Sequence, residues 1–160
     1  MIASPTADLD PPSGVIAIGA SAGGVEALKQ LAASLPPDLP YAVLVVLHMA
    51  AASPSVLAQI VDRSGPLPAT QAVDGEHLYG GHVYVAVPDR HLLIKGHRIV
   101  VSRGPTEDGH RPAINSLMRS AAVAFGPRAV GVLLSGVLDD GVLGLAAIRS
   151  RGGGHRGAGP

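Results

Sequence analysis

The stretch VIAIGASAGG, residues 15–24, decides the fold. Its first half is a short apolar run rich in β-branched residues, as is typical of a buried strand. Its second half is rich in glycine, and apolar residues then recur at helical spacing: Val25, Leu28, Leu31 and Leu35. A buried strand that turns at glycines directly into a helix is the repeating unit of α/β proteins.

The same alternation continues along the chain. Apolar strands are predicted at 43–47, 69–73, 83–87 and 130–134, and helices after residue 53, at 111–125 and at 141–149. A small hairpin is predicted around Gly96, where apolar and other residues alternate on both sides. Strands that are apolar throughout meet water on neither face. We therefore predict an α/β fold: a doubly wound, mostly parallel sheet with helices on both faces and a small antiparallel hairpin.

A chain of 160 residues suits one domain, which we place at 14–150. Residues 1–13 contain two aspartates and three prolines and have no periodic apolar pattern, so we expect a disordered lead-in. Residues 151–160 are rich in glycine and lack periodicity, so we expect an irregular tail.

The composition excludes several classes of function. Twelve basic and twelve acidic residues give no net charge, and only 2% of residues are aromatic, so nucleic-acid binding is not expected. The absence of cysteine excludes disulfides and thiolate chemistry. No apolar run approaches the roughly 20 residues of a membrane span, and no secretory signal is evident. We expect a cytoplasmic protein with no membrane insertion, no cofactor and no metal.

Ser21 stands at the centre of Gly-x-Ser-x-Gly, between a predicted strand and a predicted helix. In that context the motif can present a nucleophilic serine, with the amide of Ala22 directed at a developing oxyanion. One alternative is an ordinary glycine-rich turn in which the serine caps the helix. Another is a dinucleotide-binding loop, which fits less well because Ser21 replaces the second glycine of that motif.

Two further polar residues follow predicted strands directly. His48 comes after the strand at 43–47, and Asp140 comes shortly after the strand at 130–134. Parallel strands end at one edge of a sheet, so His48, Asp140 and Ser21 are expected near one another. A histidine could accept the serine proton, and an aspartate could orient its imidazole. The alternatives are a histidine that satisfies a strand-end carbonyl and an aspartate that caps a helix.

These residues also carry a resemblance. The chain resembles the catalytic domain of the chemotaxis protein-glutamate methylesterases, of CheB type. The matching stretches run in family order: IAIGASAGG at 16–24, LHM at 47–49, DGE at 74–76, VYVAVPDRH at 83–91, HRP at 110–112 and GVLLSG at 131–136.

The resemblance implies a function and a site. It implies a serine esterase with Ser21, His48 and Asp140 as its triad. The implied substrates are glutamate methyl esters on the cytoplasmic helices of chemoreceptors, in a signal-transduction phosphorelay, and many members of the family also deamidate glutamine. Ala22 and Val137 would contribute to the oxyanion site, and His110 would line it or only shape the start of the next helix.

The sequence departs from this family in several places. Val137 and Leu138 replace a methionine and a glycine, and Asn115 replaces a common aspartate. No receiver domain fits before the first strand, so we expect regulation to be absent or to come from a separate receiver protein. The family pattern is lost after Gly153, and we expect a C-terminally truncated chain, with a reading-frame shift near 152–154 as our hypothesis. The strand at 130–134 would then lose a neighbour.

Two other functions stay open at this point. The first is a catalytically silent, truncated interaction protein of a chemosensory array, which the altered Val137–Leu138 loop favours. The second is a nucleotide-binding module, for which the glycine-rich loop at 19–24 is the only support.

Overall fold

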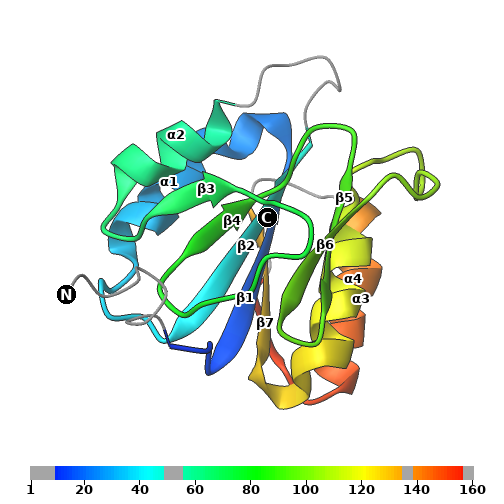
Figure 1. Ribbon diagram of the computed structural model, residues 1–160. Coiled ribbons are helices and arrows are strands. Elements are labelled where there is room, and N and C mark those ends of the chain that lie inside the picture. The colour runs from blue at the N-terminus through cyan, green and yellow to red at the C-terminus, as the bar shows by residue number, and fades with distance from the viewer. Residues whose placement is uncertain (1–9, 49–55, 135–138, 157–160) are drawn as a thin grey trace.

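A central sheet of six strands organises the protein. The computed structural model describes residues 10–48, 56–134 and 139–156. Within these ranges the strands lie in the order β3-β4-β2-β1-β7-β8, and every pairing between neighbours is parallel (Figure 1). Their bounds are β1 Gly14–Ala20, β2 Tyr41–Leu47, β3 Ala69–Gln71, β4 Val83–Val85, β7 Ala129–Leu134 and β8 Gly154–Arg156.

The remaining elements pack against this sheet. A separate antiparallel hairpin pairs β5 with β6, as the alternating pattern around Gly96 predicts. The bounds of these elements are η2 Ala22–Gly24, α1 Val25–Ser34, α2 Leu57–Ser64, β5 His91–Lys95, β6 Arg98–Ser102, α3 Ile114–Phe125, η3 Gly126–Arg128 and α4 Asp139–Ser150. The predicted helix start at Ser53–Pro54 lies outside the described residues.

The sheet is covered on both faces, as predicted. Helices α1 and α2 lie on one side of it in Figure 1, and α3, α4 and the hairpin lie on the other. Side chains along β2 alternate between the two cores: Ala42, Leu44 and Val46 face α3, while Val43 and Val45 face α1 and α2. Because each face of the strand has its own apolar cover, the strand is hydrophobic throughout.

The strand order reverses beside β1. The chain runs from β1 outward through β2 toward β4 and β3, and later returns to the other side of β1 as β7. In doubly wound proteins, ligands bind outside the carboxyl ends of the strands at such a reversal. The fold therefore predicts a ligand-binding site at the residues that follow β1, β2 and β7.

Two predictions about the chain ends are wrong within the described residues. Residues 10–13 are not a disordered lead-in: Ser13 donates its N–H to the carbonyl of Pro40, Gly80 donates to the carbonyl of Asp10, and Pro12 is buried. The tail is not wholly irregular, because Gly154–Arg156 forms β8 in register with Val130–Val132. Strand β7 therefore has a neighbour on each side.

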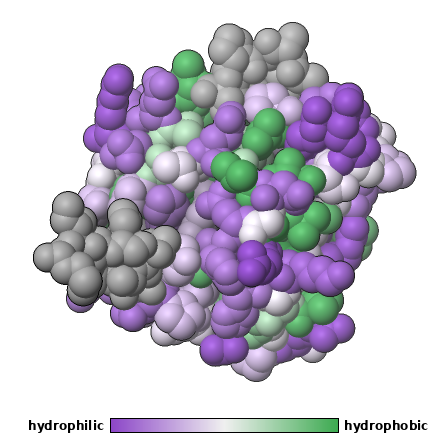
Figure 2. Space-filling model, viewed as in Figure 1, coloured by the Kyte–Doolittle hydropathy of each residue, from purple (hydrophilic) through white to green (hydrophobic). Residues whose placement is uncertain are grey.

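The surface carries few exposed apolar groups. The large exposed hydrophobic residues of the described chain are Val56, Val73, Val123, Val142 and Leu143. In Figure 2 the visible face is mostly hydrophilic, with hydrophobic residues in small groups. None of the helices in the described ranges is long and apolar enough to cross a bilayer.

Gly19 allows the start of α3 to approach the sheet closely. A Cβ at this position would lie 2.5 Å from Cγ2 of Ile114, which is fully buried. Real Cβ atoms do not come that close to another carbon, so any larger residue would displace the first turn of α3. The glycine of the Gly-x-Ser-x-Gly motif thus has a packing role besides any role in the turn.

We predict that Gly19→Ala destabilises the protein by about 1–3 kcal/mol, the usual cost of overpacking a filled core. Gly23→Ala is the matched control, because a Cβ there would have no atom within 4 Å. The free energies of unfolding in urea measure both effects. Equal stability of the two variants would contradict this account of Gly19.

Candidate active site

Three neighbouring strands deliver the predicted site residues to one edge of the sheet. Ala20 pairs with Leu47 on one side and with Leu134 on the other. The backbone N–H of His48 then donates to the carbonyl of Ala20 at 2.9 Å. Ser21 and His48 are therefore the next residues after directly paired strand ends, as the rule for parallel strands predicts.

His48 and Asp140 form a hydrogen-bonded pair. Nε2 of His48 lies 2.8 Å from Oδ2 of Asp140, 92 residues away in sequence. The Asp140 side chain is fully buried, and that of His48 is 16% exposed. A carboxylate can only accept here, so Nε2 carries the proton and Nδ1 is left as the basic nitrogen of the neutral ring. The pair joins the end of β2 to the segment that follows β7.

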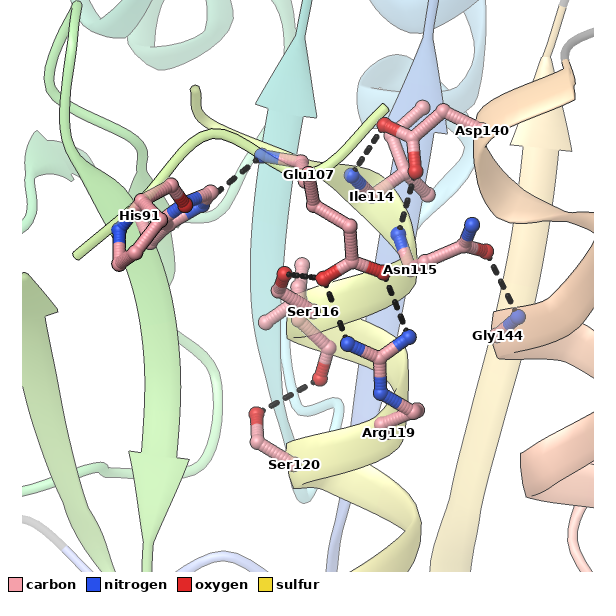
Figure 3. A network of polar contacts seen from close by, with 12 residues as sticks. His91, Glu107, Ile114, Asn115, Ser116, Arg119, Ser120, Asp140 and Gly144 are labelled. Atoms are coloured by element: carbon pink, nitrogen blue, oxygen red, sulfur yellow. Dashed lines mark hydrogen bonds and ion pairs between the residues drawn. The ribbon is translucent and has the colours of Figure 1, made fainter. Parts of the chain in front are cut away.

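Asp140 also caps helix α3. Its carboxylate accepts the N–H of Ile114 at 2.5 Å and the N–H of Asn115 at 2.8 Å (Figure 3). Ala113, at the N-cap position, has no side-chain group to do this. The predicted alternative, an aspartate that caps the helix that follows it, is therefore wrong, because the helix that Asp140 caps is α3. The N-terminal end of a helix also stabilises negative charge.

These contacts set the ionisation of Asp140. Burial by itself would raise the pKa of its carboxyl group, and the hydrogen bonds from His48, Asn115 and Ile114 outweigh burial, so the pKa is lowered. Asp140 is therefore an anion throughout the neutral range. An anion on Nε2–H fixes the tautomer of His48 and stabilises the imidazolium that forms when Nδ1 accepts a proton.

Helix α3 begins at Ile114, three residues after the predicted start at Arg111–Pro112. The residues before it are held by His91, which is buried. Nδ1 of His91 accepts the N–H of Ala113 at 3.2 Å, and Nε2 donates to the carbonyl of Pro105 at 2.8 Å. His91 thus accepts the N–H of Ala113, while Asp140 accepts the next two N–H groups along the chain. The sequence position of His91 does not indicate this role.

His110 stacks on His48. The two imidazole rings are nearly parallel, at 4°, with centroids 4.0 Å apart. Both rings line a cavity of about 210 Å³, with further walls from Asp89, Thr106, Gly109, Arg111 and Pro112. His110 therefore lines the space in front of His48, and the ring contact restricts how the His48 ring can turn.

A polar network ties the His110 loop to α3. Glu107 and His110 exchange backbone hydrogen bonds of 2.9 Å in both directions. The Glu107 carboxylate accepts from Ser116 and from both terminal nitrogens of Arg119 (Figure 3). The hydrogen bond from Arg119 is the largest influence on Glu107 and lowers its pKa. Helix α3 therefore binds Asp140 through the amides of its first turn. Through Ser116 and Arg119 it also holds Glu107, which is bonded to His110.

The other predicted site residues lie as follows. Ser21 is half-buried, with extended backbone angles (φ −80°, ψ 170°), and occupies the N-cap position of η2 without a side-chain cap bond. Ala22 is exposed at the start of η2. Val137 lies outside the described residues. Within the described chain, no group of three or more His, Asp or Glu residues could hold a metal ion.

The fold and site define an α/β domain with a buried carboxylate–histidine pair beside a serine-bearing strand end. Residues 16–155 match the family described as CheB methylesterase, and the chain belongs to this family. The catalytic domain of the CheB methylesterase of Thermotoga maritima superposes with a TM-score of 0.80 at 28% identity, over 89% of this chain and 77% of that one.

Two curated relatives carry the name protein-glutamate methylesterase/protein-glutamine glutaminase. Number 4 of Myxococcus xanthus is 43% identical over 141 residues, which is 88% of this chain and 40% of that protein. Number 3 of Anaeromyxobacter dehalogenans is 45% identical over 152 residues, which is 93% of this chain and 44% of that protein. The chain thus spans less than half the length of these relatives.

We predict that Asp140→Ala lowers the free energy of unfolding by about 2–6 kcal/mol, because two buried amides lose their acceptor at about 1–3 kcal/mol each. The neighbouring variant Asp139→Ala is the control, because Asp139 is exposed. Urea unfolding at pH 7 measures both. A loss no larger than that of Asp139→Ala would contradict the capping role.

The pH dependence provides a second prediction. Because folding lowers the pKa of Asp140, its stabilising effect is complete above the unfolded pKa of about 3.9 and is lost as pH falls through the folded value. The difference in unfolding free energy between the native protein and Asp140→Asn should therefore shrink as pH falls below about 4. A difference that does not change down to the acid limit would contradict it.

Proposed function

We propose that this domain is a protein-glutamate methylesterase that hydrolyses glutamate methyl esters on the cytoplasmic helices of chemoreceptors. Ser21 is the nucleophile, His48 the base and Asp140 the orienting acid. The observation that carries the proposal is the 2.8 Å bond between His48 Nε2 and buried Asp140, on the strand end paired with the one that bears Ser21. Membership of the CheB methylesterase family supports the same chemistry.

The reaction follows from these roles. Nδ1 of His48 takes the proton of the Ser21 hydroxyl while its oxygen attacks the ester carbonyl carbon. The tetrahedral intermediate collapses, the bond to the methoxy oxygen breaks, and His48 returns the proton so that methanol leaves. A water molecule, deprotonated by His48, then attacks the acyl–serine ester; the bond to the Ser21 oxygen breaks, His48 returns the proton to that oxygen, and the glutamate side chain is released as its carboxylate.

His48 would act through Nδ1 because Nε2 is held by Asp140. In the serine proteases the aspartate holds Nδ1 and Nε2 acts on the serine. The roles of the two ring nitrogens are thus exchanged, while the chemistry is the same: one nitrogen is fixed by an anion, and the other moves the proton. The stacked ring of His110 keeps the imidazole plane in place.

The developing oxyanion needs hydrogen-bond donors. The amide of Ala22, at the start of η2, is one proposed donor, and helix starts favour negative charge. Val137, three residues before Asp140 in the sequence, is the proposed second contributor. Glutamine deamidation can use the same groups, because the amide carbonyl passes through the same intermediate and ammonia leaves in place of methanol.

The cavity in front of His48 suits a small substrate group. Its volume of about 210 Å³ lies below the 300–1,000 Å³ typical of small-molecule pockets, so it matches one esterified side chain presented by a protein. A larger cavity, of about 560 Å³, lies between α1 and α2 and contains none of the proposed site residues. The proposed partners are methylated receptor helices in the cytoplasm and a separate receiver protein that regulates the domain.

We predict that Ser21→Ala abolishes release of methanol from methylated receptor, with a loss of roughly 10⁴- to 10⁶-fold, as for other serine hydrolases. His48→Asn should lose a similar factor. Ser34→Ala is the control, because Ser34 is an exposed residue at the end of α1 whose hydroxyl bonds only within that helix.

Equal methanol release by the native protein and Ser21→Ala would overturn the esterase proposal. If neither protein releases methanol while the native domain still binds the receptor helices, the domain is a catalytically silent interaction protein.

A further inference from the structure

Three arginine side chains surround one carboxylate beside the cavity in front of His48. The carboxylate is that of Asp89, which lines this cavity together with Arg111. Nη2 of Arg111 lies 2.9 Å from Oδ1 of Asp89. On the other oxygen, Oδ2, the contacts are longer: 3.7 Å to Arg90 and 3.8 Å to Arg103. These four residues, the arginine cluster, place three positive charges around one negative charge and so carry an excess of positive charge.

Arg111 is the member of the arginine cluster that fixes the backbone. Its Nε donates to the carbonyl of Asp89 at 3.2 Å and to Oδ1 of Asp89 at 3.0 Å. Its Nη1 donates to the carbonyl of Gly104 at 3.2 Å. Asp89 has a φ of 60°, in the left-handed region that few residues other than glycine adopt. Arg111 therefore holds this turn and the segment at Gly104 in place beside the cavity.

Arg90 and Arg103 are bound much less tightly. Arg90 donates to the carbonyl of Asp89 at 2.9 Å, and its distance to the carboxylate exceeds that of a hydrogen bond. The Arg103 side chain is 67% exposed, and in the described part of the chain its one polar contact is the long ion pair with Asp89. Exposed pairs of this kind are weak. The charge of Arg103 is therefore available to a second anion.

The other acidic residues of the same loop do not neutralise the arginine cluster. The hydrogen bond with Glu107 is the largest influence that raises the pKa of Arg119, and the charge of Asp108 raises it further. Both acids therefore lie close to the Arg119 guanidinium. The loop is thus balanced in charge on the side of Arg119 and positive on the side of Asp89.

An excess of guanidinium groups at this place suits a carboxylate. The planar N–H groups of arginine match the two oxygens of a carboxylate, and a guanidinium is always charged at neutral pH. Residues one turn apart on a helix lie on the same face. An acidic side chain one turn from an esterified glutamate can therefore lie beside the cavity while the ester occupies it.

We propose, on the basis of the proposed esterase function, that the arginine cluster is a subsite for a carboxylate of the substrate helix. Arg90 and Arg103 attract the carboxylate, and Arg111 keeps the cluster fixed beside the cavity. The domain then favours methyl esters that have an acidic residue one helical turn away. The subsite contributes to recognition of the substrate and not to the chemical step, as is usual for charges at the rim of a binding site.

The first test compares two helical peptides that each carry one glutamate methyl ester. One peptide has glutamate, and the other glutamine, one turn before and one turn after the ester. The native domain should release methanol from the acidic peptide with the higher kcat/KM. Arg103→Gln should reduce this preference by about 2- to 5-fold, mainly through KM, which corresponds to one exposed ion pair. Arg103→Lys, which keeps the charge, should retain most of the preference.

Arg149→Gln is the matched control. It removes the same charge from an exposed residue in the last turn of α4, a helix that starts with Asp139 and Asp140 at the site. The preference for the acidic peptide should stay unchanged in this variant. A preference that survives in Arg103→Gln, or that Arg149→Gln lowers as much, would overturn the subsite.

The second test needs no turnover. The same two peptides, with methionine in place of the ester and a fluorescent label, are titrated with the native domain, and anisotropy gives Kd. The acidic peptide should bind about 2- to 5-fold more tightly than the neutral one at low salt. The difference should disappear at about 1 M salt, where charges are screened beyond about 3 Å.

The two proposals can fail separately in these experiments. Equal Kd values for the two peptides at low salt would overturn the carboxylate subsite, whether or not the domain is an esterase. A native domain that binds the acidic peptide more tightly but releases no methanol from either ester would refute the esterase proposal and still support the subsite.

Discussion

The buried carboxylate of Asp140 is bonded at once to the ring of His48 and to the first two amides of α3. One oxygen serves both His48 and Ile114, and the other serves Asn115. Three parts of the fold therefore meet at one group: the end of β2, the start of α3 and the segment after β7. A buried anion is tolerated only when it is paired and hydrogen-bonded, and here each of its partners also belongs to the site.

This arrangement couples stability to chemistry. The donors that stabilise the charge of Asp140 also cap α3, so the orientation of His48 is maintained by contacts that the folded state requires. Gly19 has no side chain, so Ile114 at the start of α3 can pack close to β1. His110 stacks on His48 and restricts the rotation of its ring. The site is thus built on rigid elements, and this helps to hold proton-transfer groups in place.

The strands and the pairing of His48 with Asp140 could be predicted from sequence. Strands buried on both faces are apolar throughout, and parallel strands end at one edge, so His48 and Asp140 could be placed together without a structure. The resemblance to the CheB family led to the same residues. Ser21 also lies at the predicted strand end, whereas the roles of Ala22 and Val137 stay predictions.

Other features had no signal in the sequence. The residues of strand β8 are exposed, so the strand needs no apolar pattern. It is held by its backbone pairing with β7 and not by burial of its side chains. The contacts of Asn115 with Gly141 and Gly144 span 26 and 29 residues and depend on how two helices meet. Nothing in the sequence indicates that His91 accepts the N–H of Ala113, just before α3. Such contacts are set by tertiary packing, which neither periodicity nor motif spacing describes.

The most direct test of this account is the tautomer of His48, observed by nitrogen-15 NMR of the imidazole ring at pH 7 to 8. Bonding to the Asp140 carboxylate predicts a neutral ring that carries its proton on Nε2, with Nδ1 unprotonated and available as the base. A ring that carries its proton on Nδ1 would contradict the account, because Asp140 would then not be the group that orients His48.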